Sequence, residues 1–130
     1  MSGLLTAACA DGVLRLTLND PATRNSLSDA MMAALGQRLE AAADDRSVRV
    51  IVLAATGPVF SSGHNLKDIT AHRTDADKGA AYFASLFDRC AQLMLGIVRH
   101  PKPVIAEVSG LASAAGCQLV ALSLIHISEP

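Results

Sequence analysis

Two short segments of small and polar residues carry the chemistry that this sequence suggests. "FSSGHNLK", residues 60–67, and "GLASAAG", residues 110–116, each follow an apolar, β-branched run. Small side chains let a substrate oxygen approach backbone N–H groups, and a helix that begins there adds the positive end of its dipole. Two such N–H groups, one from each segment, would form an oxyanion hole, in which one donor contributes about 3 kcal/mol to catalysis. The alternative for either segment is close packing of a helix against a strand.

Side chains that could move a proton are scarce around these two segments. Gln118 is the first large polar residue after the second segment, and an amide donates or accepts hydrogen bonds without serving as a general base near neutral pH. Glu107 is the nearest carboxylate. Strand alternation places it on the face of Ile105, opposite the apolar residues of the same run, so we expect a paired structural charge. We expect Asp68 to be a surface or capping residue.

The elements that must position these groups can be read from the sequence pattern. Asp11-Gly12 between two apolar runs predicts a β-hairpin. Residues 19–28 predict a loop, and Ser28 is the expected N-cap of a helix that ends near Asp44. The β-branched run from Val48 predicts a strand buried on both faces. Residues 59–69 predict a loop.

The second half of the chain repeats this alternation. A helix is expected from about Asp75 to His100, with one apolar stripe. The stripe consists of Phe83, Phe87, Cys90, Met94 and Ile97. Two prolines end this helix, "VIAEV" predicts the next strand, and "SAAGCQLVAL" predicts the next helix. Strands that alternate with helices predict an α/β fold in a single domain.

Composition excludes several classes of protein. Apolar residues make up 51% of the chain and charged residues 18%, with a net charge of −1. The low fraction of charged residues indicates buried strands or surfaces that other subunits cover. The net charge and the lack of a basic run or an aromatic stacking set argue against nucleic acid as a partner. No apolar run is long enough for a membrane span, and the Cys and His spacings do not predict a metal site. We expect a cytoplasmic protein, or a mitochondrial one in a eukaryotic source, although the N-terminus shows no clear transit peptide.

Three stretches resemble the enoyl-CoA hydratase/isomerase (crotonase) family. They are "DPATRNSLS", "VRVIVLAATGPVFSSGHNLKDI" and "KPVIAEVSGLASAAGCQLVA", spaced as in the family, and the resemblance runs from Val13 to Leu122. It implies an α/β fold with a truncated, crotonase-like ββα spiral core. Residues 1–122 would be the N-terminal part of that domain, and 123–130, "SLIHISEP", would be an aberrant tail foreign to the family. Within the family, "SSGHNLK" and "GLASAAGCQLVA" indicate one particular branch.

The resemblance also implies an acyl-CoA thioester site. Matched to this chain, the backbone N–H groups of His64 and Ala115 stabilise a thioester enolate. The family usually carries glycine where Ala115 stands, so its methyl group would narrow the pocket. Ser62 and His64 match the segment whose backbone contacts the adenine of coenzyme A, and Arg24 and Lys67 match basic side chains near its phosphates. Solvated surface charge is an equal alternative for Arg24 and the favoured one for Lys67.

The expected reaction depends on Gln118, which stands where hydratases of the family carry their first catalytic glutamate. The place of the second glutamate lies beyond the chain, so both observations argue against hydratase activity. We expect the full-length parent to be a lyase or isomerase of acyl-CoA and fatty-acid metabolism, and the fragment to be inactive. The alternatives are a non-catalytic acyl-CoA-binding pseudoenzyme and a structural subunit. A serine hydrolase built on Ser113 lacks a recognisable His–Asp pair.

The resemblance further implies the partners of the full-length parent. It would assemble as a homotrimer or a hexamer, and coenzyme A would enter as part of the substrate, with no separate cofactor.

Overall fold

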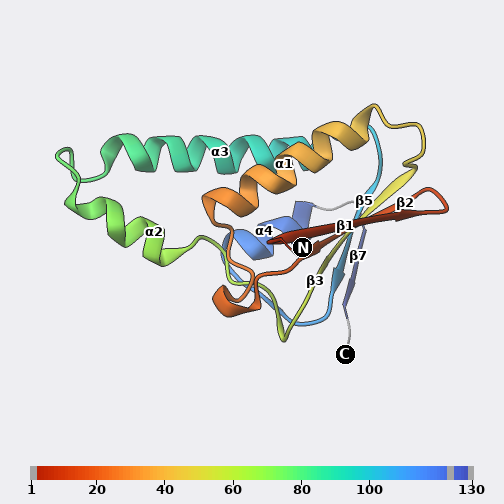
Figure 1. Cartoon of the computed structure of the whole chain (residues 1–130), viewed down its shortest axis with the longest axis horizontal. Helices are drawn as coiled ribbons and strands as arrows, with labels where there is room; N and C mark the ends of the chain where they lie inside the picture. The colour runs from red at the N-terminus through yellow and green to blue at the C-terminus, as the bar shows by residue number, and fades with distance from the viewer. Residues whose placement is uncertain (1–2, 123–124, 129–130) are drawn as a thin grey trace.

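Two long helices lie side by side across one face of a twisted sheet (Figure 1). The computed structural model describes residues 3–122 and 125–128, and for residues 122 and 125–128 the backbone alone. The helices are α1 (Asp29–Ala43) and α3 (Ala80–Val98). In the described part of the chain, no helix combines the length and the apolar character that a bilayer crossing requires.

The main sheet has five strands in the order β1-β2-β3-β5-β7. These strands are β1 (Leu5–Ala10), β2 (Val13–Leu18), β3 (Val50–Ala55), β5 (Val104–Val108) and β7 (Ile125–Ser128). Strands β1 and β2 pair antiparallel, and the other neighbours pair parallel. The predicted hairpin is confirmed: Asp11 and Gly12 have φ values of 53° and 82°. Positive φ at both central residues is what a two-residue hairpin turn requires.

A second, two-stranded sheet lies beyond the carboxyl ends of β3 and β5. It pairs β4 (Val59–Ser61) with β6 (Leu111–Ala112) in parallel. Helix α4 (Ala115–Leu122) follows β6, and helix α2 (Leu66–Ala71) follows β4. Short 3₁₀ turns span Pro21–Thr23 and His72–Thr74. The prediction of a plain loop over 59–69 was therefore wrong, because both elements there are too short to show a periodic pattern.

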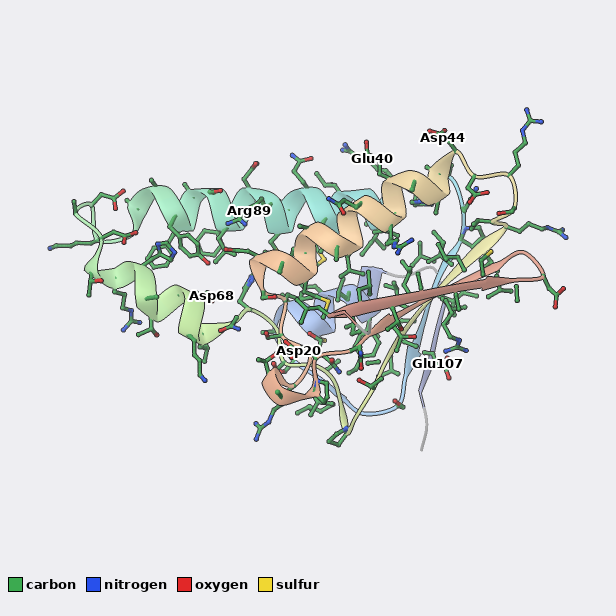
Figure 2. All side chains as sticks on the ribbon, viewed as in Figure 1. Asp20, Glu40, Asp44, Asp68, Arg89 and Glu107 are labelled. Atoms are coloured by element: carbon green, nitrogen blue, oxygen red, sulfur yellow. The ribbon has the colours of Figure 1, made fainter. Side chains whose placement is uncertain are left out.

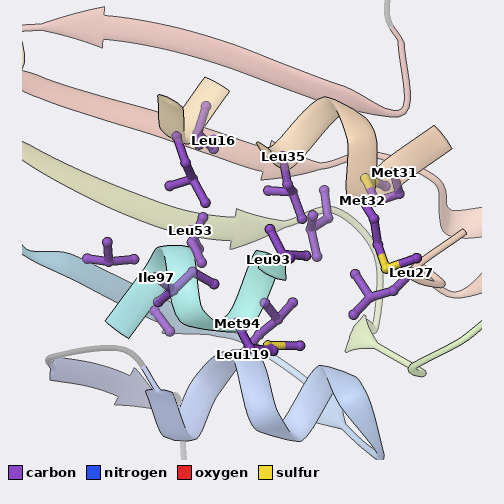
Figure 3. Packing of buried hydrophobic residues seen from close by; sticks show 14 of the residues in the cluster. Leu16, Leu27, Met31, Met32, Leu35, Leu53, Leu93, Met94, Ile97 and Leu119 are labelled. Atoms are coloured by element: carbon purple, nitrogen blue, oxygen red, sulfur yellow. The ribbon is translucent and has the colours of Figure 1, made fainter. Parts of the chain in front are cut away.

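Helix α1 begins as the sequence predicts. The Ser28 side chain accepts a hydrogen bond from the Met31 N–H at 3.1 Å, and the helix ends at Ala43, capped by Asp44. Its buried residues face the sheet and meet those of α3 and α4 (Figure 3). Within this cluster, the side chains that are at most 1% exposed include Leu16, Leu18, Leu27, Met31, Leu35, Ile51, Leu53 and Leu119.

Two packing predictions need correction. Strand β3 is not buried on both faces: Ile51 and Leu53 are buried, whereas Val50 and Val52 are only half-buried, because the described helices cover one face of the sheet. On α3, Phe87 is 62% exposed. The buried stripe runs instead through Leu86, Cys90, Leu93, Met94 and Ile97. Apolar residues surround most of this helix, so periodicity alone could not tell which side meets the sheet.

Glu107 is paired, as the sequence predicts. Its carboxylate forms an ion pair with Arg15 of β2, across the intervening strand β3. Figure 2 shows Glu107 at the sheet, far from Asp68 on α2. Both partners are roughly half exposed, so solvent screens the pair and its net contribution to stability is about 0–1 kcal/mol.

Candidate functional site

Pairing of β4 with β6 brings the two small-residue segments into contact. Val59 pairs with Leu111 and Ser61 with Ala112. The Ser113 N–H donates to the Ser61 carbonyl at 3.0 Å, which extends this pairing toward the start of α4. The segments lie about fifty positions apart in the chain, yet they form one continuous backbone surface beyond the carboxyl ends of β3 and β5.

Two glycines explain how closely the segments approach. Gly63 has a φ of +90°, and a Cβ there would lie 2.9 Å from the Ala114 Cβ and 3.3 Å from the Ala115 N. A Cβ on Gly116 would lie 2.5 Å from the Ser61 carbonyl oxygen. Real Cβ atoms essentially never lie within 3.0 Å of another heavy atom, so close packing excludes a side chain at both positions, and the positive φ of Gly63 disfavours one as well. The two segments do pack closely, and the same approach places the Ala115 N beside residue 63.

A third segment, residues 20–27, completes the wall and is anchored by Asn25. This side chain is 0% exposed. Its Nδ2 donates to the carbonyls of Thr56 and Val59 at 2.8 and 2.9 Å, and its Oδ1 accepts from the Asp20 N–H at 2.7 Å. Arg24 and Asn25 both have left-handed φ values, 58° and 54°, so the chain turns sharply here. The sequence pattern predicts only that Asn25 lies in the loop of residues 19–28.

Ser61 ties this third segment to the first. The Ser61 Oγ donates to the Asn25 carbonyl at 2.8 Å, and the Ser61 side chain is fully buried. The Leu27 N–H donates to the Gly63 carbonyl at 2.6 Å, and the Ser62 N–H donates to the Arg24 carbonyl at 3.1 Å. The sequence carries no signal for the role of Ser61, because nothing local shows that a serine will be buried.

The three segments border a half-open hollow of about 550 Å³. Four of the residues expected to bind a ligand line it: Arg24, Ser62, His64 and Lys67. The other lining residues are Ala22, Thr23, Ser26, Asn65, Leu66, Ile69 and Ala114. Among these described residues two are basic and none is acidic, so the hollow suits an anionic ligand.

The expected oxyanion donors flank Gly63. In the described part of the chain, no hydrogen bond uses the backbone N–H of His64 or of Ala115. The next amides of α4 are occupied: Gly116 and Cys117 donate to the Ser113 carbonyl, and Gln118 donates to that of Ala114. Both N–H groups are therefore available as donors, and an oxyanion hole requires two such groups that converge on one oxygen.

Ala114 and Ala115 lie at the start of helix α4, and their methyl groups lie in different surroundings. Ala115 is 6% exposed and its methyl belongs to the hydrophobic core, so it does not narrow the hollow as expected. The methyl that lines the hollow is that of Ala114. Ala114 has a φ of +50°, in the left-handed region that is sterically unfavourable for residues with a Cβ.

Gln118 does not line the hollow. It lies one turn along α4 from Ala114 and is exposed. Cys117 is exposed as well, and among the described residues no His–Asp pair approaches Ser113. The described part of the chain also shows no cluster of His, Cys, Asp or Glu side chains that could hold a metal ion.

Helix α2 forms the outer wall and is capped by Asn65. The Asn65 Oδ1 accepts from the Lys67 and Asp68 N–H groups at 2.9 and 3.3 Å, so Asp68 lies in the first turn without being the cap. Beyond α2, the His72 ring stacks on Tyr82 of α3 with centroids 3.6 Å apart.

Tyr82 links this wall to helix α1. Its hydroxyl donates to the Asp29 Oδ2 at 3.3 Å. Burial, followed by the charges of Asp29 and Asp68, raises the pKa of Tyr82 above its ordinary value of 10.0. The neutral phenol is therefore the form that the fold stabilises.

Comparison with known proteins agrees with the fold and the motifs. A model described as "Enoyl-CoA hydratase/isomerase" matches residues 8–129. Human mitochondrial enoyl-CoA hydratase domain-containing protein 3 is 47% identical over 119 residues, 92% of this chain and 38% of that protein. The 2,3-dehydroadipyl-CoA hydratase of Escherichia coli K12 is 41% identical over 110 residues, 85% of this chain and 40% of that protein. A solved Mycobacterium smegmatis enoyl-CoA hydratase superposes with a TM-score of 0.88 at 46% identity, covering 98% of this chain and 48% of that one.

These matches decide the family and the branch. The branch that "SSGHNLK" and "GLASAAGCQLVA" indicate is that of enoyl-CoA hydratase domain-containing protein 3, and the 47% identity confirms the resemblance. The chain spans less than half the length of these relatives. The family match reaches residue 129, and the foreign origin of residues 123–130 stays a prediction. Fold, motifs and matches together show that this chain belongs to the enoyl-CoA hydratase/isomerase family.

Proposed function

We propose that the hollow between residues 20–27, 59–69 and 111–115 binds a coenzyme A thioester. The observation that carries this proposal is the meeting of Arg24, Ser62, His64 and Lys67 around one hollow that no acidic residue of the described chain lines. Coenzyme A presents phosphates, which favour basic side chains, and a thioester carbonyl, which favours N–H donors. Names of relatives such as 2,3-dehydroadipyl-CoA hydratase support the same ligand class.

Each wall would then recognise one part of the ligand. Arg24 and Lys67, both exposed at the rim, would pair with the phosphates. The backbone at Ser62 and His64 would contact the adenine. The N–H groups of His64 and Ala115 would hold the thioester oxygen and stabilise the negative charge that develops on it when an enolate forms. Coenzyme A is part of the substrate in this proposal, and no separate cofactor is needed.

A second candidate, binding of the thioester without turnover, has an observation of its own. No carboxylate lines the hollow in the described part of the chain, and the exposed Gln118 stands where a hydratase of the family would carry its first acid. Hydration of an enoyl thioester needs a group that activates water and a group that delivers a proton. We therefore expect crotonyl-CoA to bind and to be hydrated very slowly, unless the longer parent supplies an acid.

Calorimetric titration of the 130-residue chain with acetyl-CoA tests the binding. We expect saturable binding that weakens about tenfold in the Arg24→Ala variant, because one charge-assisted hydrogen bond to a phosphate is lost. The matched control is Arg46→Ala, which removes an exposed arginine at the opposite end of β3. Equal affinity of the two variants, or no binding by folded wild-type chain, would refute the site.

Turnover is tested separately by mass spectrometry of mixtures with crotonyl-CoA and a panel of acyl-CoA thioesters. Hydration as fast as that of a hydratase with two glutamates would contradict the role assigned to Gln118. For the longer parent we propose a homotrimer or a hexamer, located in mitochondria if the source is eukaryotic and in the cytoplasm otherwise.

A further inference from the structure

One ring nitrogen at the hollow has no partner. His64 is half-buried and lines the hollow, and its Nδ1 is fully buried with no hydrogen bond to any described residue. Buried polar atoms in folded proteins nearly always have a partner, and one without a partner destabilises the fold. The two other imidazoles that the structure describes, those of His72 and His100, are both hydrogen-bonded.

The surroundings of His64 favour one tautomer of the neutral ring. A buried N–H without an acceptor is rarer in folded proteins than a buried acceptor without a donor. The hydrogen therefore belongs on Nε2, and Nδ1 is the acceptor left unpaired. Because Nδ1 is buried, Nε2 on the other side of the ring is the nitrogen left to reach the hollow that His64 lines.

The backbone N–H and the imidazole of His64 belong to the same residue, and this limits which part of a thioester the Nε2–H could contact. The backbone N–H of the same residue is the proposed donor to the thioester oxygen, and the imidazole lies one side-chain length away from it. Atoms two or three bonds beyond the thioester lie at that distance, in the acyl chain on one side and in the pantetheine arm on the other. Leu66, Ile69 and Ala114, which line the same hollow, are apolar, and the lining side chains of Ser26 and Asn65 are hydrogen-bonded to each other.

We propose that the His64 imidazole is a specificity-determining residue that donates a hydrogen bond from Nε2 to a ligand oxygen close to the thioester. That oxygen belongs either to a substituent on the third carbon of the acyl chain or to the nearer amide of the pantetheine arm. The inference rests on the proposed function of the hollow and adds to it a side-chain contact, distinct from the backbone contact of the same residue.

The test compares three ligands by calorimetry: coenzyme A, butyryl-CoA and 3-hydroxybutyryl-CoA. The variant is His64→Ala, and His64→Gln is the matched variant that keeps an N–H donor. An approximately tenfold loss in His64→Ala for 3-hydroxybutyryl-CoA alone assigns the acyl oxygen. A similar loss for all three ligands assigns the pantetheine amide. In either case His64→Gln recovers part of the affinity.

A nitrogen NMR measurement on the wild-type chain gives an answer even if the alanine variant does not fold. Formation of the hydrogen bond shifts the Nε2 resonance of His64 when ligand is added, and leaves the resonances of His72 in place. Unchanged affinity in His64→Ala together with an unmoved Nε2 resonance overturns the inference, while the proposed function stands as long as the wild-type chain binds. Absence of binding by the folded wild-type chain overturns the proposed function itself.

Discussion

Asn25 is the side chain whose removal should damage the hollow most. It is 0% exposed, and it makes three hydrogen bonds of 2.7–2.9 Å to backbone groups of Asp20, Thr56 and Val59. In the Asn25→Ala variant these three groups lose their partner inside the protein. Each hydrogen bond stabilises the fold by about 1 kcal/mol net, so their loss lowers the free energy of unfolding by about 3 kcal/mol.

The backbone conformation adds a further effect that can be separated. Asn25 has a φ of 54°, a left-handed conformation that asparagine adopts at a lower energetic cost than alanine does. An alanine at position 25 lowers the free energy of unfolding by about 1 kcal/mol more, which brings the expected loss for Asn25→Ala to about 4 kcal/mol. Glycine adopts this φ without a steric penalty, so Asn25→Gly should lose only the contribution of the hydrogen bonds, about 3 kcal/mol.

Urea unfolding followed by circular dichroism measures these differences as shifts of the midpoint at constant slope. Asn19→Ala is the control, because Asn19 is half-buried and its two side-chain hydrogen bonds, to the Gly3 carbonyl and from the Thr56 hydroxyl, are both long at 3.2 Å. The Thr56 hydroxyl keeps the Leu18 carbonyl as an acceptor in that variant. We expect a loss below about 1 kcal/mol for that variant. A loss of the same small size for Asn25→Ala would refute the claim that this side chain holds residues 20–27 in place.

Three further predictions test the packing and the electrostatics. Gly116→Ala should destabilise the chain by about 2 kcal/mol, because the new Cβ would lie 2.5 Å from a carbonyl oxygen. Gly36→Ala should stabilise α1 by about 1 kcal/mol, because no atom lies within 4 Å of the new Cβ. The urea midpoints of the two variants should therefore move in opposite directions, and any other result would contradict this account. Ser28→Ala should lose about 1 kcal/mol with the N-cap hydrogen bond, and helix content by circular dichroism together with the urea midpoint checks it. Burial and nearby carboxylates raise the pKa of Tyr82 in the folded state. As the pH rises, the phenol therefore loses its proton in the unfolded chain before it does so in the folded one. The free energy of unfolding should then fall above pH 10.0, the ordinary pKa of tyrosine. Urea midpoints measured between about pH 8 and 11 should show this fall in the wild-type chain and a smaller one in Tyr82→Phe, and equal falls would argue against it.

Local chemistry made part of the fold predictable. The hairpin at Asp11-Gly12 and the cap at Ser28 follow from the residues themselves, because a positive φ and an N-cap oxygen are needs that few residue types meet. The face of α3 that carries Phe87 could not be predicted, since its burial depends on which elements cover it. Strand β4 and helix α2 were missed because three and six residues are too few for a period to appear.

The candidate site divides in the same way. His64, Ser62, Arg24 and Lys67 were found through motif resemblance, and the structure places them around one hollow. Asn25 was missed, because its importance lies in carbonyl groups 31 and 34 positions away. The sequence around a residue does not show whether its side chain will form hydrogen bonds with distant backbone groups.

The β4–β6 pairing has a consequence for how the hollow forms and opens. Bonds that close the hollow join residues 36, 39 and 51 positions apart, whereas the β1–β2 hairpin closes through a two-residue turn. The pairings of β2 with β3 and of β3 with β5 span similar separations, but the hydrophobic core packs against those strands, whereas β4 and β6 share only a short register. The hollow should therefore assemble after the main sheet. In native-state hydrogen exchange, the amides of Leu27, Ser62 and Ser113 should then exchange together and faster than those of β2 and β3. The ligand site would behave as a separate cooperative unit, and a bound thioester would slow the exchange of these amides first.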